Sequence, residues 1–288
     1  MPRACMRAGA SAAWRTVSMG EGRGDSSVRS FLVCVALAVC GACAGTGPSS
    51  LGLDAGDSGM DAGDAGGPAV WFQRNAGVKI LPLGDSITAG YVAELGGYRW
   101  PLENLLLDAG YAFDYVGSLR IASPPDMPRP WHEGHGGFQI ESLDGGNQLE
   151  GAVVDSAVRT YQPDVILLLA GTNNLNFPDY LDPVKTSAMY DRLLTQIFTL
   201  NPAVGVVASP VRWKTAVPAY YVADFNDHVH AVVDRYADAG YHITWVAGMT
   251  DAIDGGVDDL PDGIHPSQPA YERMAEQWFE SLQSVSGQ

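Results

Sequence analysis

From about residue 70 onward, short apolar runs alternate with longer stretches of mixed apolar and polar residues. The apolar runs predict buried strands at 78–83, 112–117, 164–170, 203–208 and 242–247. The longer stretches predict helices at about 98–109, 145–160, 184–200, 219–239 and 269–284. This alternation is typical of an α/β fold, a three-layer α/β/α sandwich around a mainly parallel, five-stranded sheet covered on both faces.

Polar residues follow the first of these runs where a loop at the sheet edge is expected. Right-handed crossovers place the carboxyl ends of parallel strands at one edge, where the ligand sites of open α/β sheets lie. The run 78–83 ends in Gly84-Asp85-Ser86. A serine there is either a helix cap or a nucleophile, and a nucleophile at a helix start would have its own N–H ready to stabilise an oxyanion.

Three later stretches carry candidate chemistry of their own. Residues 131–140 place glycines around a histidine, which indicates either a flexible turn or a loop whose backbone N–H groups approach a ligand closely. Asn173 directly follows the run 164–170, and its amide is either a cap or a donor to a developing negative charge. Asp262 and His265 lie three residues apart, so the carboxylate can orient an imidazole that accepts a proton from serine.

The first 69 residues have a different character. Arginines precede the short apolar run 31–40 and small residues follow it, which is typical of a secretory signal, although a buried core helix is an alternative. Cleavage after Ala44 and lipidation of Cys43 are both open, and lipidation would tether the protein to a membrane. We therefore expect a signal peptide at 1–44, a disordered Gly/Ala/Asp linker at 45–69 and one folded domain at 70–288.

Composition narrows the partners and the chemistry. The 288 residues include 17 Lys and Arg against 33 Asp and Glu, and the net charge of −16 argues against nucleic acid and an anionic membrane surface as partners. All four cysteines lie in the first 43 residues, which excludes a disulfide or thiolate metal site within the predicted domain. The histidines match no recognised zinc spacing, so we expect neither a metal nor another cofactor.

The order of the four stretches, Ser, Gly, Asn and then Asp-x-x-His, resembles the SGNH hydrolases, also called the GDSL esterases and lipases. The resemblance covers roughly residues 78–275 and implies a flavodoxin-like fold and a serine esterase that works through an acyl-enzyme. It maps Ser86 to the nucleophile, with Asp262 and His265 completing the catalytic triad. The usual third block is Gly-x-Asn-Asp; here Asn174 replaces the aspartate, which affects loop bracing and leaves the preceding Asn173 intact.

The same resemblance implies an oxyanion hole. Its donors map to the N–H of Ser86, the N–H of Gly137 and the side-chain amide of Asn173, with Gly136 as the near alternative to Gly137. These groups would hold the negative oxygen of a tetrahedral intermediate.

A narrower resemblance, to carbohydrate esterase family three with its acetylxylan esterases, rests on four segments: 84–90, 96–99, 113–118 and 132–138. It implies that an acetylated polysaccharide or oligosaccharide of the xylan type is the substrate. The candidate substrate-binding residues are Asp85, Trp131, His135, Phe138 and Asn174. Sequence leaves open whether His132 and His135 touch substrate or brace the glycine loop.

Two other functions remain alternatives. One is a general esterase, lipase or thioesterase that acts on longer acyl chains, because chain preference depends on pocket depth. The other is a non-catalytic carbohydrate-binding protein with the same fold. In each case we expect a monomer that is exported, either to the extracellular space or as a cell-surface or periplasmic lipoprotein.

Overall fold

The computed structural model describes residues 71–142, 144–176, 182–212, 217–253 and 258–287. The predicted signal peptide and linker lie outside these residues. Within the described ranges, no helix combines the length and apolar character needed to cross a membrane.

A parallel sheet forms the middle layer of the domain. Its main strands lie side by side in the order β2-β1-β4-β5-β6, and all pairs in this path are parallel. Their bounds are β1 (Val78–Gly84), β2 (Phe113–Tyr115), β4 (Val165–Leu169), β5 (Gly205–Ala208) and β6 (Ile243–Trp245). These strands lie at the five predicted apolar runs, and the predicted α/β class is confirmed.

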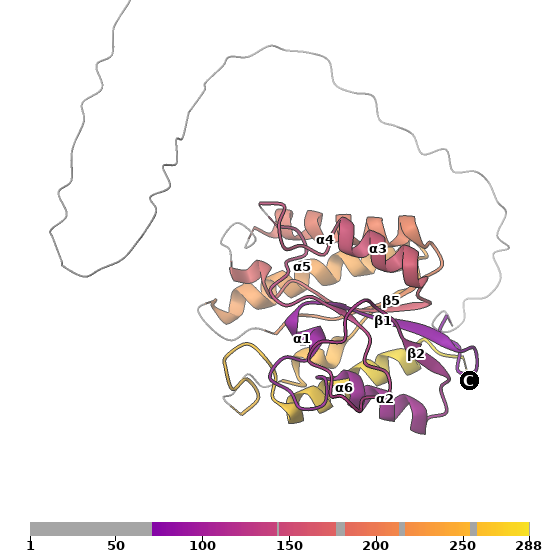
Figure 1. Ribbon diagram of the computed structural model, residues 1–288. Helices are drawn as coiled ribbons and strands as arrows, with labels where there is room; N and C mark the ends of the chain where they lie inside the picture. Colours follow the sequence, from indigo (N-terminus) through magenta and orange to yellow (C-terminus); the bar gives the residue numbers. More distant parts are fainter. Residues whose placement is uncertain (1–70, 143, 177–181, 213–216, 254–257, 288) are drawn as a thin grey trace, which may run out of the picture. The chain divides into compact units, whose positions relative to one another are not determined.

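Helices cover both faces of the sheet. Figure 1 shows α3, α4 and α5 on one face and α1, α2 and α6 on the other. The bounds of these helices are α1 (Ser86–Ala89), α2 (Arg99–Asp108), α3 (Ala152–Tyr161), α4 (Pro183–Leu200), α5 (Ala219–Asp238) and α6 (Gln268–Ser284). Because neither face meets water, the central strand β4, with the sequence Val-Ile-Leu-Leu-Leu, is buried at every position.

One predicted helix begins later than expected. The stretch 145–160 was predicted to be helical, but α3 starts only at Ala152. Gly145 and Gly151 have φ values of 68° and 91°, in the left-handed region that interrupts a right-handed helix. The residues just before α3 belong instead to a loop. Its two sides are joined by a hydrogen bond from the Leu149 N–H to the Gln139 carbonyl at 2.9 Å.

A two-residue strand, β3 (Glu133–Gly134), was not predicted, because so short a strand leaves no periodic signal. It pairs in parallel with the end of β1, with Leu83 opposite Glu133 and Gly84 opposite Gly134. A Cβ on Gly134 would lie 2.4 Å from the Ala89 nitrogen, so the glycine allows β3 to approach α1 closely. The pairing brings the glycine-rich loop beside the helix that begins at Ser86.

Helix α1 begins with a buried cap. The Asp85 side chain is fully buried, and its Oδ1 accepts the Ile87 N–H at 2.9 Å. Burial raises the pKa of Asp85 to about 6, although the Ile87 N–H, the nearby Thr172 hydroxyl and the imidazole of His265 each favour the ionised form. This carboxylate therefore gives the domain a titration at mildly acidic pH.

Replacing Asp85 with Asn should remove that titration while keeping an acceptor for the Ile87 N–H. A pKa raised from 3.8 to about 6 makes the native state retain the proton longer, so the wild-type free energy of unfolding falls as pH rises through this window. Relative to wild type, the Asp85→Asn variant should gain about 2 kcal/mol in free energy of unfolding between pH 4 and pH 6. Urea unfolding at a series of pH values measures this, and a difference that stays constant with pH would contradict it.

Candidate active site

Three side chains form a continuous hydrogen-bonded chain at the carboxyl edge of the sheet. The Ser86 Oγ lies 2.8 Å from His265 Nε2, and His265 Nδ1 lies 2.7 Å from Asp262 Oδ2. Ser86 is the first residue of α1, directly after β1, whereas the other two residues lie in the loop before α6. Residues 179 positions apart in sequence are thus in direct contact.

The loop between Asp262 and His265 holds the imidazole in one orientation. Asp262 Oδ1 accepts the N–H groups of Ile264 and His265 at 2.9 and 2.7 Å, which fixes the carboxylate against its own loop. Partial burial alone would raise the pKa of Asp262, but the hydrogen bonds from His265 and Ile264 outweigh it and hold the pKa below its ordinary value. An ionised carboxylate accepts the proton on Nδ1, so the lone pair of Nε2 faces the serine.

The predicted oxyanion donors gather around the same hollow as the serine and the histidine. This serine hollow has a volume of ≈400 Å³ and is lined by Ser86, Tyr91, Gly137, Asn173, Asn176, Ile264 and His265. The Ser86 N–H belongs to the first turn of α1, where N–H groups have no acceptor within the helix. Asn173 donates one amide hydrogen to the Phe138 carbonyl at 2.8 Å, which leaves its second for a ligand.

The glycine loop is fixed by buried polar side chains. His132 is fully buried, and its Nδ1 accepts the Gly134 N–H at 2.9 Å, so its Nε2–H donates to the Ile121 carbonyl at 2.9 Å. Burial, together with the nearby Arg99 guanidinium, lowers the pKa of His132 to about 3. The ring is therefore neutral and holds the loop in place, which answers one question that the sequence left open.

His135 also braces this loop. Its Nε2 lies 2.7 Å from the buried Glu133 carboxylate, and its backbone N–H donates to the Gly84 carbonyl at 2.9 Å. The His135 and Phe138 rings pack with centroids 4.8 Å apart. Neither side chain is among those that line the serine hollow, and both belong to the loop that carries Gly137.

Three more of the candidate substrate-binding residues do not line the serine hollow. Asp85 and Asn174 are fully buried: Asp85 caps α1, and Asn174 accepts the Ile140 N–H at 2.8 Å and donates to the Glu141 carbonyl at 3.1 Å. Asn174 thus supplies the loop bracing that its replacement of an aspartate left in question. Trp131 is 41% exposed and lines a separate hollow with Tyr115 and Tyr161.

Sequence reasoning missed three residues that line the serine hollow: Tyr91, Asn176 and Ile264. Ile264 lies inside the Asp-x-x-His stretch and could have been found there. The Tyr91 ring lies 5.8 Å from the His265 ring, a proximity that sequence does not signal because the two residues are far apart along the chain.

A buried arginine ties α1 to its surroundings. Arg99 is fully buried, and its guanidinium donates to the carbonyls of Thr88, Ala89 and Pro130 at 3.1, 2.9 and 2.9 Å. Burial lowers the pKa of Arg99 to about 10, which still leaves it charged near neutral pH. A cation at the carboxyl end of the helix satisfies carbonyls that have no partner within it.

The described residues contain no cluster of three or more His, Cys, Asp or Glu side chains that could hold a metal ion. What the geometry provides is a hydroxyl next to a basic imidazole, a carboxylate that orients the imidazole, and N–H donors around one hollow. This arrangement can deprotonate the serine and stabilise a tetrahedral oxyanion.

Comparisons with known proteins agree with this geometry. The "GDSL-like Lipase/Acylhydrolase family" model matches residues 83–273. A "Multidomain esterase" of Ruminococcus flavefaciens is 29% identical over 231 residues, which are 72% of this chain but only 28% of that protein's length.

Solved structures give the same picture. A family 3 carbohydrate esterase of Clostridium thermocellum superposes with a TM-score of 0.61 at 29% identity, covering 73% of this chain and 99% of that one. A carbohydrate esterase family 3 structure from Talaromyces cellulolyticus has a TM-score of 0.57 at 24% identity, covering 72% and 97%, and supports the fold alone. The resemblances found in the sequence are confirmed, and the chain belongs to the GDSL-like lipase/acylhydrolase family.

Proposed function

We propose that this protein is a serine esterase that removes acetyl groups from xylan-type carbohydrate esters through an acyl-enzyme. The observation that carries the proposal is the hydrogen-bonded chain Ser86–His265–Asp262, which opens into the same hollow as Gly137 and Asn173. A serine contacting an imidazole that is itself bound to a carboxylate is the arrangement that nucleophilic acyl transfer requires.

The reaction follows from this geometry. Ser86 Oγ attacks the ester carbonyl while His265 Nε2 accepts its proton, and the Ser86 N–H, the Gly137 N–H and the Asn173 amide stabilise the oxyanion. His265 then donates the proton to the leaving sugar oxygen, the bond between that oxygen and the carbonyl carbon breaks, and the acetyl group remains esterified to Ser86 Oγ. A water molecule, activated by the same imidazole, hydrolyses this ester and regenerates the serine.

Two observations support a carbohydrate acetate as the substrate. The family 3 carbohydrate esterase is 29% identical to this chain, and the match covers 99% of that protein. The serine hollow, at ≈400 Å³, includes the hydroxyl of Tyr91 and the amide of Asn176 beside the reacting groups, and these can bind the hydroxyls of a sugar. Aryl esters of longer acids would test the alternative that the enzyme prefers acyl chains longer than acetyl.

We further propose that the enzyme acts outside the cytoplasm, on the strength of the signal-like segment at residues 1–44 and the linker after it. Expression in a bacterial host and mass spectrometry of the mature amino terminus would test this. We expect either a lipid-modified Cys43 or a chain that begins after Ala44. A protein that keeps the apolar run 31–40 would contradict export.

Replacing Asn173 with Ala should lower kcat for p-nitrophenyl acetate on the order of 100–1,000-fold, because one oxyanion donor is lost. The Ser86→Ala variant should be inactive. The matched control is Asn75→Ala, an exposed asparagine before β1, which should keep wild-type kinetics. Circular dichroism would establish that each variant is folded, and near-normal kcat in a folded Asn173→Ala protein would contradict the assigned role.

Wild-type protein should release acetate from acetylated xylan and from p-nitrophenyl acetate, and should cleave p-nitrophenyl octanoate more slowly than the acetate. Acetate release and nitrophenol absorbance measure the three rates. Cleavage of the aryl acetate without release from xylan would remove the polysaccharide substrate and keep the serine mechanism. Faster cleavage of the octanoate would favour a general esterase or lipase instead.

A further inference from the structure

A second hollow adjoins the serine hollow. This amide hollow has a volume of ≈310 Å³ and is lined by Gly137, Gln139, Ser142, Asp144, Asn147, Asn173 and Asn176. It shares Gly137, Asn173 and Asn176 with the serine hollow, so the two lie side by side on this surface. A ligand whose ester lies at Ser86 can therefore extend into the amide hollow past the oxyanion donors.

The lining of the amide hollow offers hydrogen bonds rather than apolar surface. Gln139 Oε1 is buried and has no hydrogen-bond partner among the described residues, which leaves an acceptor waiting for a donor. The exposed Asn147 adds a side-chain amide with both a donor and an acceptor. Such groups match the hydroxyls of a sugar ring, each of which both donates and accepts.

Asp144 supplies the one carboxylate of the lining. Hydrogen bonds from the Ser142 hydroxyl and the Gly146 N–H hold the pKa of Asp144 below its ordinary value, and both donors bind Oδ1. Its Oδ2 therefore remains an acceptor for a ligand hydroxyl. No lysine or arginine lines this hollow in the described part of the chain, so an uncharged ligand fits it better than an anionic one.

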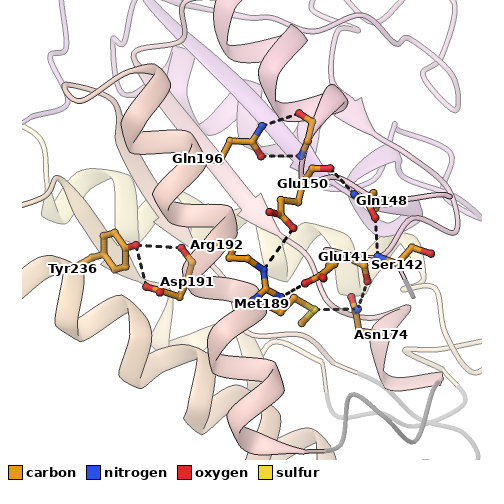
Figure 2. Close-up of polar contacts among 11 residues, drawn as sticks. Glu141, Ser142, Gln148, Glu150, Asn174, Met189, Asp191, Arg192, Gln196 and Tyr236 are labelled. Atoms are coloured by element: carbon orange, nitrogen blue, oxygen red, sulfur yellow. Dashed lines mark hydrogen bonds and ion pairs between the residues drawn. The ribbon is translucent and has the colours of Figure 1, made fainter. Parts of the chain in front are cut away.

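The loop that carries this lining is held to α4 before any ligand arrives. Figure 2 shows Arg192 of α4 bound to Glu141, Gln196 bound to the backbone beside Glu150, and Gln148 bound to Ser142. Gln196 makes two bonds with Gly151, accepting its N–H at 2.8 Å and donating to its carbonyl at 2.7 Å. A loop fixed in this way loses little conformational freedom when a ligand binds.

We propose that the amide hollow is a subsite for an uncharged sugar ring that adjoins the acetylated ring. The subsite rests on the proposed carbohydrate esterase function and makes it more specific: the enzyme distinguishes an acetylated oligosaccharide from an acetylated single sugar. Gln139, Asp144 and Asn147 bind the neighbouring ring, while Ser86 and His265 act on the ester.

The test compares kinetics with direct binding. Acetate release is measured on acetylated xylotriose, acetylated xylose and p-nitrophenyl acetate, using full-length wild type, Asn147→Ala, Asp144→Asn and the exposed control Asn75→Ala. For each subsite variant, kcat/KM on the trisaccharide should fall on the order of fivefold further than on the other two substrates, mainly through KM. Calorimetry measures the binding of unacetylated xylotriose to the same proteins.

Each outcome separates the subsite from the esterase. If wild type cleaves the trisaccharide and both subsite variants behave like Asn75→Ala on every substrate, the subsite is wrong and the esterase stands. If no acetylated sugar is cleaved but xylotriose binds and Asn147→Ala weakens that binding at least threefold, the subsite stands and the carbohydrate esterase function is wrong. If the protein neither binds xylotriose nor releases acetate from acetylated xylotriose, both proposals are overturned.

Discussion

The backbone pairing at the end of β1 is the constraint on which the site depends. Gly84 is paired with Leu169 of β4 on one side and with Gly134 of β3 on the other. A Cβ on Gly84 would lie 2.0 Å from the Leu169 carbonyl oxygen, so only glycine allows the strands to meet here. Because Ser86 follows Gly84 by two residues, this junction delivers the serine, the glycine loop and the segment of Asn173 to one place.

The short helix α1 is held at both ends by buried charges of opposite sign. Asp85 binds the N–H of Ile87 at its beginning, and Arg99 binds the carbonyls of Thr88 and Ala89 at its end. Burying an ionised group is costly unless hydrogen bonds replace its water, and the helix backbone supplies part of that replacement, with one N–H for Asp85 and two carbonyls for Arg99. The signs also match the partial charges at the two helix ends. A helix of only four residues thereby holds Ser86 in a fixed position.

The amino-acid sequence by itself determined the fold class and the candidate reacting groups. A strand that is buried on both faces appears in the sequence as a continuous apolar run. Because such a run can be recognised locally, β1 and the other main strands could be predicted without knowing which strands they pair with. Ser86, Asn173 and the Asp262–His265 pair were found because each follows a strand or forms a tight local loop of recognisable composition. Their contacts depend on parallel strands ending at one edge, which is a general property of the fold.

Tertiary structure decided which side chains line the serine hollow. Asn174 and Asp85 lie next to site residues in sequence, yet both are fully buried and bind backbone groups, while the exposed Trp131 lines a different hollow. Tyr91 reaches the serine hollow, and Gln139, Asp144 and Asn147 line a second one. Local sequence sets which chemistry is present. The direction of each side chain depends on how distant segments such as α4 and the glycine loop pack together. The contacts that decide this packing are made between residues far apart in the chain, so no local stretch of sequence reveals them.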